Sequence, residues 1–292
     1  MFHGSIVALI TPMHTDGSID YGSLEKLIDW HLTKKTDGIV VLGTTGESAT
    51  IESNERREII TLTVSSVNHK IPVIVGTGSN ATNQAIAMTK EAMSLGADAA
   101  LLVTPYYNKP TQEGLFQHYR AISKAVPIPQ ILYNVPSRTC CDLLPETISR
   151  LSAFSNIVAV KEATGDLNRL KQLLSSNLKM DFLAGDDKTA MEFMLLGGKG
   201  VISVAANVAP QLLHDLCVAA VAGDRQTAEK VNNKLNELYS ALFVETNPIP
   251  TKWVLEKMGL IQSGIRLPLT PLSLQWHSTI ESVRKNICDL SL

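Results

Sequence analysis

The sequence repeats one pattern along most of its length: a short apolar run typical of a buried strand, followed by a segment whose apolar residues have helical spacing. The pattern occurs eight times, from the strand Ile6–Thr11 to the strand Gly200–Val204 and the helix Pro210–Ala222. Alternation at this period requires parallel strands joined by helical crossovers. Eight such units predict an α/β fold, a closed (β/α)8 TIM barrel.

The chain has 292 residues, more than the ~250 that are typical of such a barrel. The remainder, residues 224–292, is predicted to form helices broken at Asn247–Pro250 and at Pro268–Pro271. No charged linker or low-complexity tract separates it from the rest. We therefore expect a barrel over residues 1–223 and an appended C-terminal helical segment, residues 224–292, packed on it.

Composition argues against several partners. The formal net charge is −2 and the basic residues are scattered, so neither nucleic acid nor a membrane is an expected partner. The first apolar run has no basic lead-in and reads as a strand, not a signal peptide, and no apolar stretch approaches ~18 residues. The cysteines Cys140, Cys141, Cys217 and Cys288 lack CxxC spacing, which predicts a reduced cytoplasmic protein without structural zinc.

The apolar run Ile157–Val160 leads directly into Lys161. Because a strand buried on both faces is apolar throughout, we expect this cation at the rim of the sheet, where barrels of this kind build their sites. Its amine could attack a carbonyl if its pKa fell from about 10.4 toward neutrality, a change of roughly 4 kcal/mol that desolvation can supply. The alternative is a lysine that extends to water without a catalytic role.

Other polar residues that follow strands are expected at the same mouth: Thr44, Thr45, Tyr106, Tyr107, Tyr133, Arg138 and the turn Gly185–Asp187. An amine, several hydroxyls and a guanidinium suit Schiff-base chemistry, which needs a nucleophile, a proton shuttle and a group that holds a carboxylate. Structural alternatives stay open for each: a tight turn or weak phosphate cradle at Gly43–Gly46, a core role for Tyr133, and a surface role for Arg138 in the expected loop Pro136–Thr139. Tyr106 and Tyr107 point to opposite faces if the chain is extended there, so one can be functional while the other packs. Asp186 and Asp187 have no clustered histidines beside them, so we expect no metal.

Four motifs extend these observations: Gly43-Thr44-Thr45-Gly46-Glu47, Thr104-Pro105-Tyr106-Tyr107-Asn108, Tyr133-Asn134-Val135-Pro136-Ser137-Arg138-Thr139 and Val160-Lys161-Glu162-Ala163-Thr164-Gly165. In order and spacing they resemble the family of 4-hydroxy-tetrahydrodipicolinate synthases, also called dihydrodipicolinate synthases. That family belongs to the N-acetylneuraminate lyase superfamily of class I pyruvate-dependent aldolases. The resemblance covers essentially the whole chain, including the segment Asn247–Pro250.

The resemblance implies condensation of pyruvate with L-aspartate-4-semialdehyde in lysine biosynthesis, without a cofactor, by a homotetramer. Lys161 matches the lysine that forms the Schiff base and Tyr133 the tyrosine that moves protons. Thr44 and Tyr107 match the rest of the proton relay, with Tyr107 reaching into a neighbouring subunit's site. The remaining matches are to substrate-binding residues: Thr45, Gly185 and Ile202 for pyruvate, and Arg138 for the carboxylate of the aldehyde.

The chain departs from the family pattern at two places. Cys140 stands where the family usually has glycine, and a side chain there costs about 1 kcal/mol if the position needs a positive φ. In the family's lysine effector site, Ser48, Ala49, Asn80 and Tyr106 match, whereas Ser53 and Arg56 replace histidines and Gln84 replaces a glutamate. A neutral amide neutralises an ammonium less well than a carboxylate does, so we expect weak or absent inhibition by lysine.

Three other functions are compatible with parts of the pattern. A sialic acid lyase or keto-deoxy-sugar aldolase would share the lysine and tyrosine, but the motif Ser137–Thr139 is not expected there. A non-catalytic barrel that senses a keto acid would be expected to have lost some of these residues. A phosphosugar enzyme would place its glycine-rich loop after a late strand, whereas Gly197–Gly200 precedes one.

Overall fold

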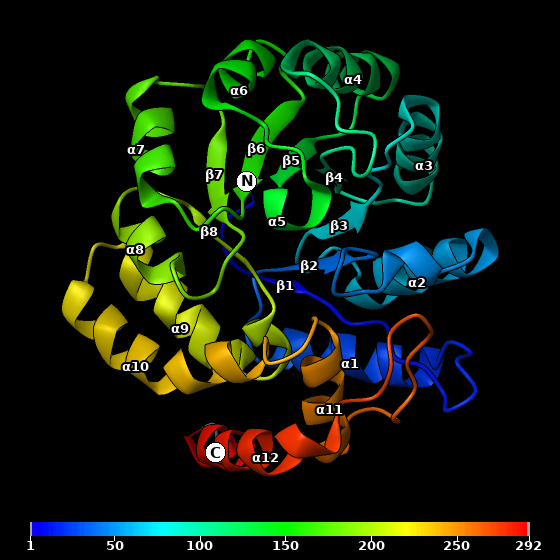
Figure 1. Ribbon diagram of the computed structural model, residues 1–292, viewed down its shortest axis with the longest axis vertical. Helices are drawn as coiled ribbons and strands as arrows, with labels where there is room; N and C mark the ends of the chain where they lie inside the picture. Colours follow the sequence, from blue (N-terminus) through cyan, green and yellow to red (C-terminus); the bar gives the residue numbers. More distant parts are fainter. Residues whose placement is uncertain (1, 291–292) are drawn as a thin grey trace.

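The structure, a computed structural model, describes residues 2–290, with side chains for residues 2–287. Eight parallel strands form a closed barrel in chain order, with helices around it, which confirms the predicted fold (Figure 1). The strands are β1 (Gly4–Ala8), β2 (Gly38–Val41), β3 (Val73–Gly76), β4 (Ala99–Val103), β5 (Gln130–Asn134), β6 (Ile157–Glu162), β7 (Asp181–Ala184) and β8 (Gly200–Ser203).

Side-chain alternation along the strands divides the core in two. In β2, Ile39 and Val41 belong to the larger cluster between sheet and helices, whereas Val40 belongs to the smaller cluster inside the barrel. The interior cluster also holds Ile131 and Tyr133 of β5. Small and branched apolar residues fill the barrel in this way, so it is a packed core with room for a site only at its mouth.

Strand β6 departs from strict alternation. Gln130 of β5 pairs with Ile157, but Ile131 pairs with Ala159, so one residue, Val158, is extra at this point of the ladder. Val158 and Ala159 accordingly both pack against the interior cluster. Beyond this bulge, Tyr133 stands directly opposite Lys161.

The main barrel helices lie on the outside of the sheet, and the C-terminal helices lie together to one side, in yellow to red in Figure 1. The helices are α1 (Tyr21–Thr33), α2 (Ser53–Val67), α3 (Thr82–Ser94), α4 (Gln112–Ala125), α5 (Pro136–Thr139), α6 (Pro145–Leu151), α7 (Leu167–Ser175), α8 (Ala190–Leu195), α9 (Pro210–Val221), α10 (Arg225–Ala241), α11 (Ile249–Lys257) and α12 (His277–Leu290). Short 3-10 turns occur at Ser48–Thr50, Ala205–Asn207 and Leu274–Trp276. Helix α10 packs on α9, and α12 packs on α10 and α11, so the C-terminal segment continues the helical layer of the barrel.

Three local expectations were wrong. The first strand is Gly4–Ala8 rather than Ile6–Thr11, because its pairing with β8 begins at Gly4 and Pro12 lacks an N–H for a ladder. The segment Pro136–Thr139 forms a short helix instead of a loop, with proline at its first position. Likewise Ile249 and Pro250 do not break a helix but begin α11, where proline is tolerated.

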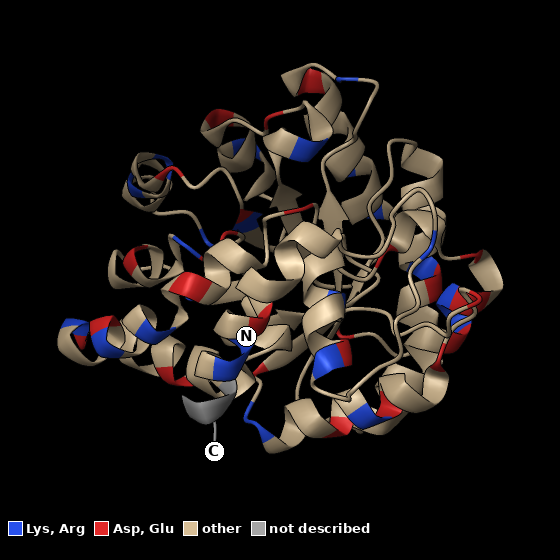
Figure 2. Cartoon of the chain, turned by 60° about the horizontal axis from the view of Figure 1, so that its bottom comes forward, with Lys and Arg blue, Asp and Glu red and all other residues tan. Residues whose placement is uncertain are grey.

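Charged residues are spread over the outer elements without a face of one sign, as Figure 2 shows. Among residues 2–290, no helix is long and apolar enough to cross a membrane. Within the same residues, no three His, Cys, Asp or Glu side chains lie together in a way that could hold a metal ion.

Candidate active site

A cavity of about 360 Å³ opens at the carboxyl ends of the strands. Its floor is formed by Ala8, Val40 and Leu101 from the barrel interior. Seven of the residues expected at the mouth line it: Thr44, Thr45, Tyr133, Arg138, Lys161, Gly185 and Asp186. The structure therefore brings these seven strand-end positions together at one cavity.

Lys161 lies inside the barrel. It is the penultimate residue of β6, not the last, and its side chain is only 6% exposed, so the alternative of a lysine extended to water is wrong. Its Nζ lies 4.1 Å from the centre of the Tyr133 ring. Within residues 2–287, no hydrogen bond or ion pair to a protein group engages this amine. An amine next to an aromatic face and without a carboxylate partner is placed for reaction with a bound carbonyl.

The loop after β2 carries Thr44 and Thr45. Thr45 is buried, and its Oγ1 accepts a hydrogen bond of 2.9 Å from Nδ2 of Asn247. The loop ends at Glu47, whose backbone is left-handed with φ of +56°. The hydroxyl of Thr11 donates to the carbonyl of Gly46 at 2.7 Å. These contacts fix the two hydroxyls at the cavity wall.

Arg138 reaches the cavity from α5. It is exposed, and none of the ion pairs between described residues includes it. The helix ends at Cys140, whose φ is +52°, so the position does adopt the left-handed conformation expected for it. A free guanidinium at the rim of a cavity can bind a carboxylate through two parallel hydrogen bonds.

A buried polar network supports β5 and β6 from outside the barrel. Nδ2 of Asn134 donates to Glu162 at 3.1 Å and to Asp142 at 2.9 Å, and the backbone N–H of Thr164 donates to Glu162 at 2.8 Å. Burial raises the pKa of Glu162, while these hydrogen bonds and Arg169 oppose the rise. The network thus joins Asn134 and Glu162, the two residues that directly follow the paired Tyr133 and Lys161 in their strands.

The turn after β7 contributes backbone more than side chains. Gly185 donates to the carbonyl of Glu162 at 2.7 Å, and a Cβ at this position would lie 2.6 Å from that of Ala163, so only glycine fits. Asp187 is buried and accepts from the N–H groups of Val204 and Ala205, and burial raises its pKa. It thus holds the end of β8. Ile202 does not line the cavity but packs in the interior cluster beneath it.

The two tyrosines after β4 do not line this cavity. Tyr107 has a positive φ of +74°, is 89% exposed and is not among the residues that line the cavity. Tyr106 is half-exposed and lines a second cavity instead. The expectation that both would reach one mouth is wrong for a single chain.

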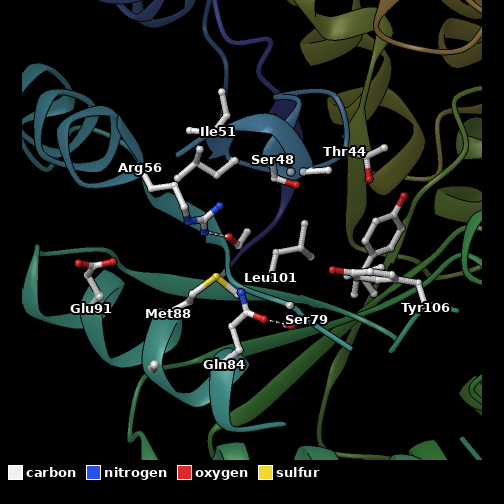
Figure 3. A pocket seen from close by; sticks show the side chains of 18 of the residues that line it. Thr44, Ser48, Ile51, Arg56, Ser79, Gln84, Met88, Glu91, Leu101 and Tyr106 are labelled. Atoms are coloured by element: carbon white, nitrogen blue, oxygen red, sulfur yellow. Dashed lines mark hydrogen bonds between the residues drawn. The ribbon is translucent and has the colours of Figure 1, made fainter. Parts of the chain in front are cut away.

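The second cavity has a volume of about 590 Å³ and is shown in Figure 3. It contains six of the seven expected effector residues: Ser48, Ala49, Ser53, Arg56, Gln84 and Tyr106. The seventh, Asn80, follows Ser79, which lines the cavity, and its carbonyl accepts from Asn108. The two cavities share Gly43, Thr44, Leu101 and Tyr133, so they meet at the candidate proton relay.

Arg56 and Glu91 are the charged residues among those that line the second cavity. The side chain of Arg56 is buried and donates to the carbonyl of Gly76 at 2.7 Å, as the dashed line in Figure 3 shows. Burial lowers its pKa from the usual value of arginine, and Glu91 opposes that change. Gln84 accepts from Ser79 at 3.0 Å. The cavity therefore carries a buried cation, a carboxylate and a neutral amide.

Sequence reasoning did not identify several residues of the active-site cavity. They are Val135, Ser137, Val204, Phe243, Thr246 and Asn247. The last three come from the connection between α10 and α11, in the segment that was expected to pack on the barrel. The motif Asn247–Pro250 was the one signal in the sequence that could have indicated this contribution.

Comparison with known proteins agrees with the geometry. The sequence model of the "Dihydrodipicolinate synthetase family" matches residues 1–287. A 4-hydroxy-tetrahydrodipicolinate synthase of Coxiella burnetii (strain Dugway 5J108-111) is 62% identical over 280 residues, which is 96% of each chain. The crystal structure of a chloride-inhibited dihydrodipicolinate synthase from Acinetobacter baumannii, complexed with pyruvate, superposes with a TM-score of 0.97 at 52% identity and covers 99% of both chains. A structure described as the first monomeric dihydrodipicolinate synthase variant has a TM-score of 0.95 at 41% identity over 98% of this chain and 97% of that one.

Proposed function

The chain belongs to the dihydrodipicolinate synthetase family and has the activity of a 4-hydroxy-tetrahydrodipicolinate synthase, and on this premise we propose which residues perform each step. The reaction condenses pyruvate with L-aspartate-4-semialdehyde, as a lyase of the class I aldolase type. The single observation that best supports our assignment is the buried Lys161 amine, 4.1 Å from the Tyr133 ring and without a carboxylate partner among the described residues.

In the first stage, Nζ of Lys161 attacks the keto carbon of pyruvate and forms a C–N bond. The keto oxygen then leaves as water, which requires protons to be moved in both directions. The Tyr133 hydroxyl, with Thr44 beside it on the cavity wall, is our candidate for this transfer. Thr45 and the backbone near Gly185 are our candidates for holding the pyruvate carboxylate.

In the second stage, the iminium acidifies the methyl group of pyruvate, and loss of a proton gives an enamine. Its carbon attacks the aldehyde, whose oxygen takes a proton and becomes the 4-hydroxyl group. The amino group of the second substrate then displaces Lys161 from the iminium carbon, which closes the ring and restores the free lysine. Arg138, exposed and unpaired at the rim, is our candidate for binding the carboxylate of this substrate.

The test is the intact mass of the protein after borohydride treatment with pyruvate. We expect one pyruvate-sized adduct on the parent and none on Lys161→Ala. Lys188→Ala, which removes an exposed lysine from the loop after β7, is the matched control and should retain the adduct. A folded parent protein that forms no adduct, or an adduct that survives Lys161→Ala, would overturn the assignment.

We propose that the active form is a homotetramer in which Tyr107 completes the proton relay of a neighbouring subunit. The support is that Tyr107 is 89% exposed and does not line the cavity of its own chain. Mixing two inactive variants tests this. If Tyr107 acts in the neighbouring subunit, mixed assemblies of Lys161→Ala and Tyr107→Phe contain sites with both residues intact, and activity returns. If it acts within one chain, mixing restores nothing, while sedimentation gives the oligomeric state independently.

We also propose that lysine inhibits this protein weakly or not at all. The buried Arg56 guanidinium in the second cavity disfavours an added ammonium, and Gln84 carries no charge to compensate it. Glu91 also lines this cavity, but its carboxylate is already paired with Arg57 at 2.6 Å. Initial rates measured across physiological lysine concentrations test the proposal. Strong inhibition in that range would contradict it, and the variant Gln84→Glu should increase the sensitivity.

Two further assignments complete the proposal. We propose that residues 1–223 act as the barrel domain and residues 224–292 as its appended segment, in agreement with the packing of α10 on α9. A cytoplasmic location is supported by substrates drawn from central metabolism and by the free thiols of Cys140, Cys141 and Cys217.

A further inference from the structure

The connection between α10 and α11 reaches into the active-site cavity through Asn247. This side chain is buried, it lines the cavity, and its Nδ2 donates to Thr45 Oγ1 at 2.9 Å. The two residues are 202 positions apart in the chain. A residue of the C-terminal segment therefore contacts the hydroxyl that is proposed to bind pyruvate.

The other end of the Asn247 amide is held from α11. The hydroxyl of Thr251, which is fully buried, donates to Oδ1 of Asn247 at 3.2 Å. An amide has a donor end and an acceptor end, and in this arrangement the acceptor end is taken by Thr251 while the donor end faces Thr45. With the ends exchanged, the amide oxygen would face Thr45 and accept its proton.

This orientation has a consequence for the Thr45 hydroxyl. A hydroxyl has one proton to donate and two lone pairs that accept. Because Asn247 occupies a lone pair, the proton of Thr45 must point elsewhere, and no acceptor among residues 2–287 takes it. A carboxylate oxygen in the cavity would be its acceptor, in a charge-assisted hydrogen bond.

The neighbouring residue on α11 fixes the far end of the same loop. Lys252 Nζ lies 2.5 Å from Oε1 of Glu47, and both side chains are buried. The positions of Thr45 and Glu47 are therefore both set by consecutive residues, Thr251 acting through Asn247 and Lys252 acting directly. A rigid loop keeps the hydroxyl in place before pyruvate binds, which lowers the entropic cost of binding.

We infer that Thr251 and Asn247 are positioning residues for pyruvate: a chain of hydrogen bonds from Thr251 through Asn247 directs the Thr45 hydroxyl proton at the substrate carboxylate. This inference rests on the proposed function, in which Thr45 holds that carboxylate. It gives the C-terminal segment a part in substrate binding in addition to its packing on the barrel.

Steady-state kinetics of Thr251→Val test the inference, because valine keeps the shape and removes the donor. Loss of one neutral hydrogen bond corresponds to about a fivefold rise in KM for pyruvate. We expect kcat at saturating pyruvate and KM for the aldehyde to stay within about twofold. Thr251→Ser, which keeps the hydroxyl, should restore KM. A loss caused only by weaker packing would instead lower Tm and leave the ratio of the two KM values unchanged.

A double-variant cycle then asks whether the residues act as one chain. Asn247→Ala and Thr45→Val should each raise KM for pyruvate by roughly tenfold, and the double variant by no more than the larger single effect. Multiplied effects, or a normal KM in folded Asn247→Ala, would overturn the inference. The borohydride adduct separates this from failure of the proposed function: if the parent forms the adduct while these KM values do not move, only the positioning role is wrong.

Discussion

Two lysines, at the barrel mouth and at the seam between barrel and C-terminal segment, are buried to the same degree: Lys161 is 6% exposed and Lys252 is 5% exposed. Lys252 has a carboxylate partner, Glu47, at 2.5 Å. The described contact of the Lys161 amine is the face of Tyr133. Burial alone therefore does not distinguish a nucleophile from a structural cation, whereas the presence of a counter-charge does.

The difference follows from what each environment does to the charged form. A buried ammonium next to a carboxylate is held in place and cannot attack a carbonyl without breaking the pair. Burial lowers the pKa of Lys252, and Glu47 opposes that change. At the barrel mouth no carboxylate among residues 2–287 holds the Lys161 amine, so its substrate can become the partner.

The largest expected effect is the loss of activity in Lys161→Met. We expect kcat to fall by at least about 10⁴-fold, because no other described amine lines the cavity. The free energy of unfolding should stay level or rise by about 1 kcal/mol, since methionine removes a buried polar amine that has no hydrogen-bond partner among residues 2–287. Turnover assays and urea denaturation measure the two quantities. A strongly destabilised Lys161→Met would contradict the distinction between Lys161 as a reactive residue and Lys252 as a stabilising one.

Lys252→Met should show the opposite result: a large loss of stability with the Schiff-base chemistry retained. Removing one partner leaves the Glu47 carboxylate buried and unpaired, which is expected to cost about 3–5 kcal/mol of unfolding free energy. The folded fraction should still form the pyruvate adduct. Replacing both partners, in Glu47→Leu with Lys252→Met, should recover most of the stability if charge is the cause. An unfolding free energy of Lys252→Met equal to that of the parent would show that the Lys252–Glu47 pair does not stabilise the contact between barrel and C-terminal segment.

A second ion pair at the seam makes a smaller, pH-dependent contribution. Arg266 of the C-terminal segment bonds to Glu55 of α2, and this contact lowers the pKa of Glu55. The carboxyl thus binds a proton less readily in the folded state, so its stabilisation is present above its usual pKa of about 4.5 and is lost as the pH falls below it. In Glu55→Gln, we expect the acid decline in unfolding free energy to flatten by about 1 kcal/mol.

Urea denaturation between pH 3 and 6 measures this slope. Glu25→Gln, which changes an exposed carboxyl of α1 outside the described ion pairs, is the control and should follow the parent. Identical slopes for the parent and Glu55→Gln would show that this ion pair does not contribute to the pH dependence of the unfolding free energy.

The smallest expected effect lies at the barrel mouth and concerns stability instead of chemistry. Cys140 adopts φ of +52°, which glycine tolerates without a Cβ penalty. Cys140→Gly should therefore raise the unfolding free energy by about 0.5–1 kcal/mol, whereas Cys140→Ala should not. Equal stabilities of the two variants would mean that the Arg138 helix is not strained, and a change in KM for the aldehyde would show that Cys140 also places Arg138.

Much of the site could be predicted from the sequence because parallel strands bring their carboxyl ends together. Lys161, Tyr133 and Thr44 each follow or end an apolar run, so locating the strands located the residues. Asn247 and Lys252 could not be found in this way. Their partners Thr45 and Glu47 lie 202 and 205 positions away, and a helical pattern indicates only which face is buried.

Tyr107 marks a different limit. The expectation that strand-end residues face the mouth assumes that the chain stays extended, but its backbone turns into the left-handed region, with φ of +74°. Most non-glycine residues avoid that region, so no local preference in the sequence predicted the turn. Its direction therefore came from the structure, and its role depends on the neighbouring subunit proposed above.

The extra residue Val158 in β6 has a consequence for transplanting this chemistry into other barrels. If the same residues of β6, Val158 included, ran as a regular strand from Ile157, Tyr133 would stand opposite Val160 and Lys161 would face the helices. A designer who copies the whole segment Ile157–Lys161 into a regular strand of a (β/α)8 scaffold would thus turn the lysine away from the barrel interior. The bulge has to be copied together with this segment.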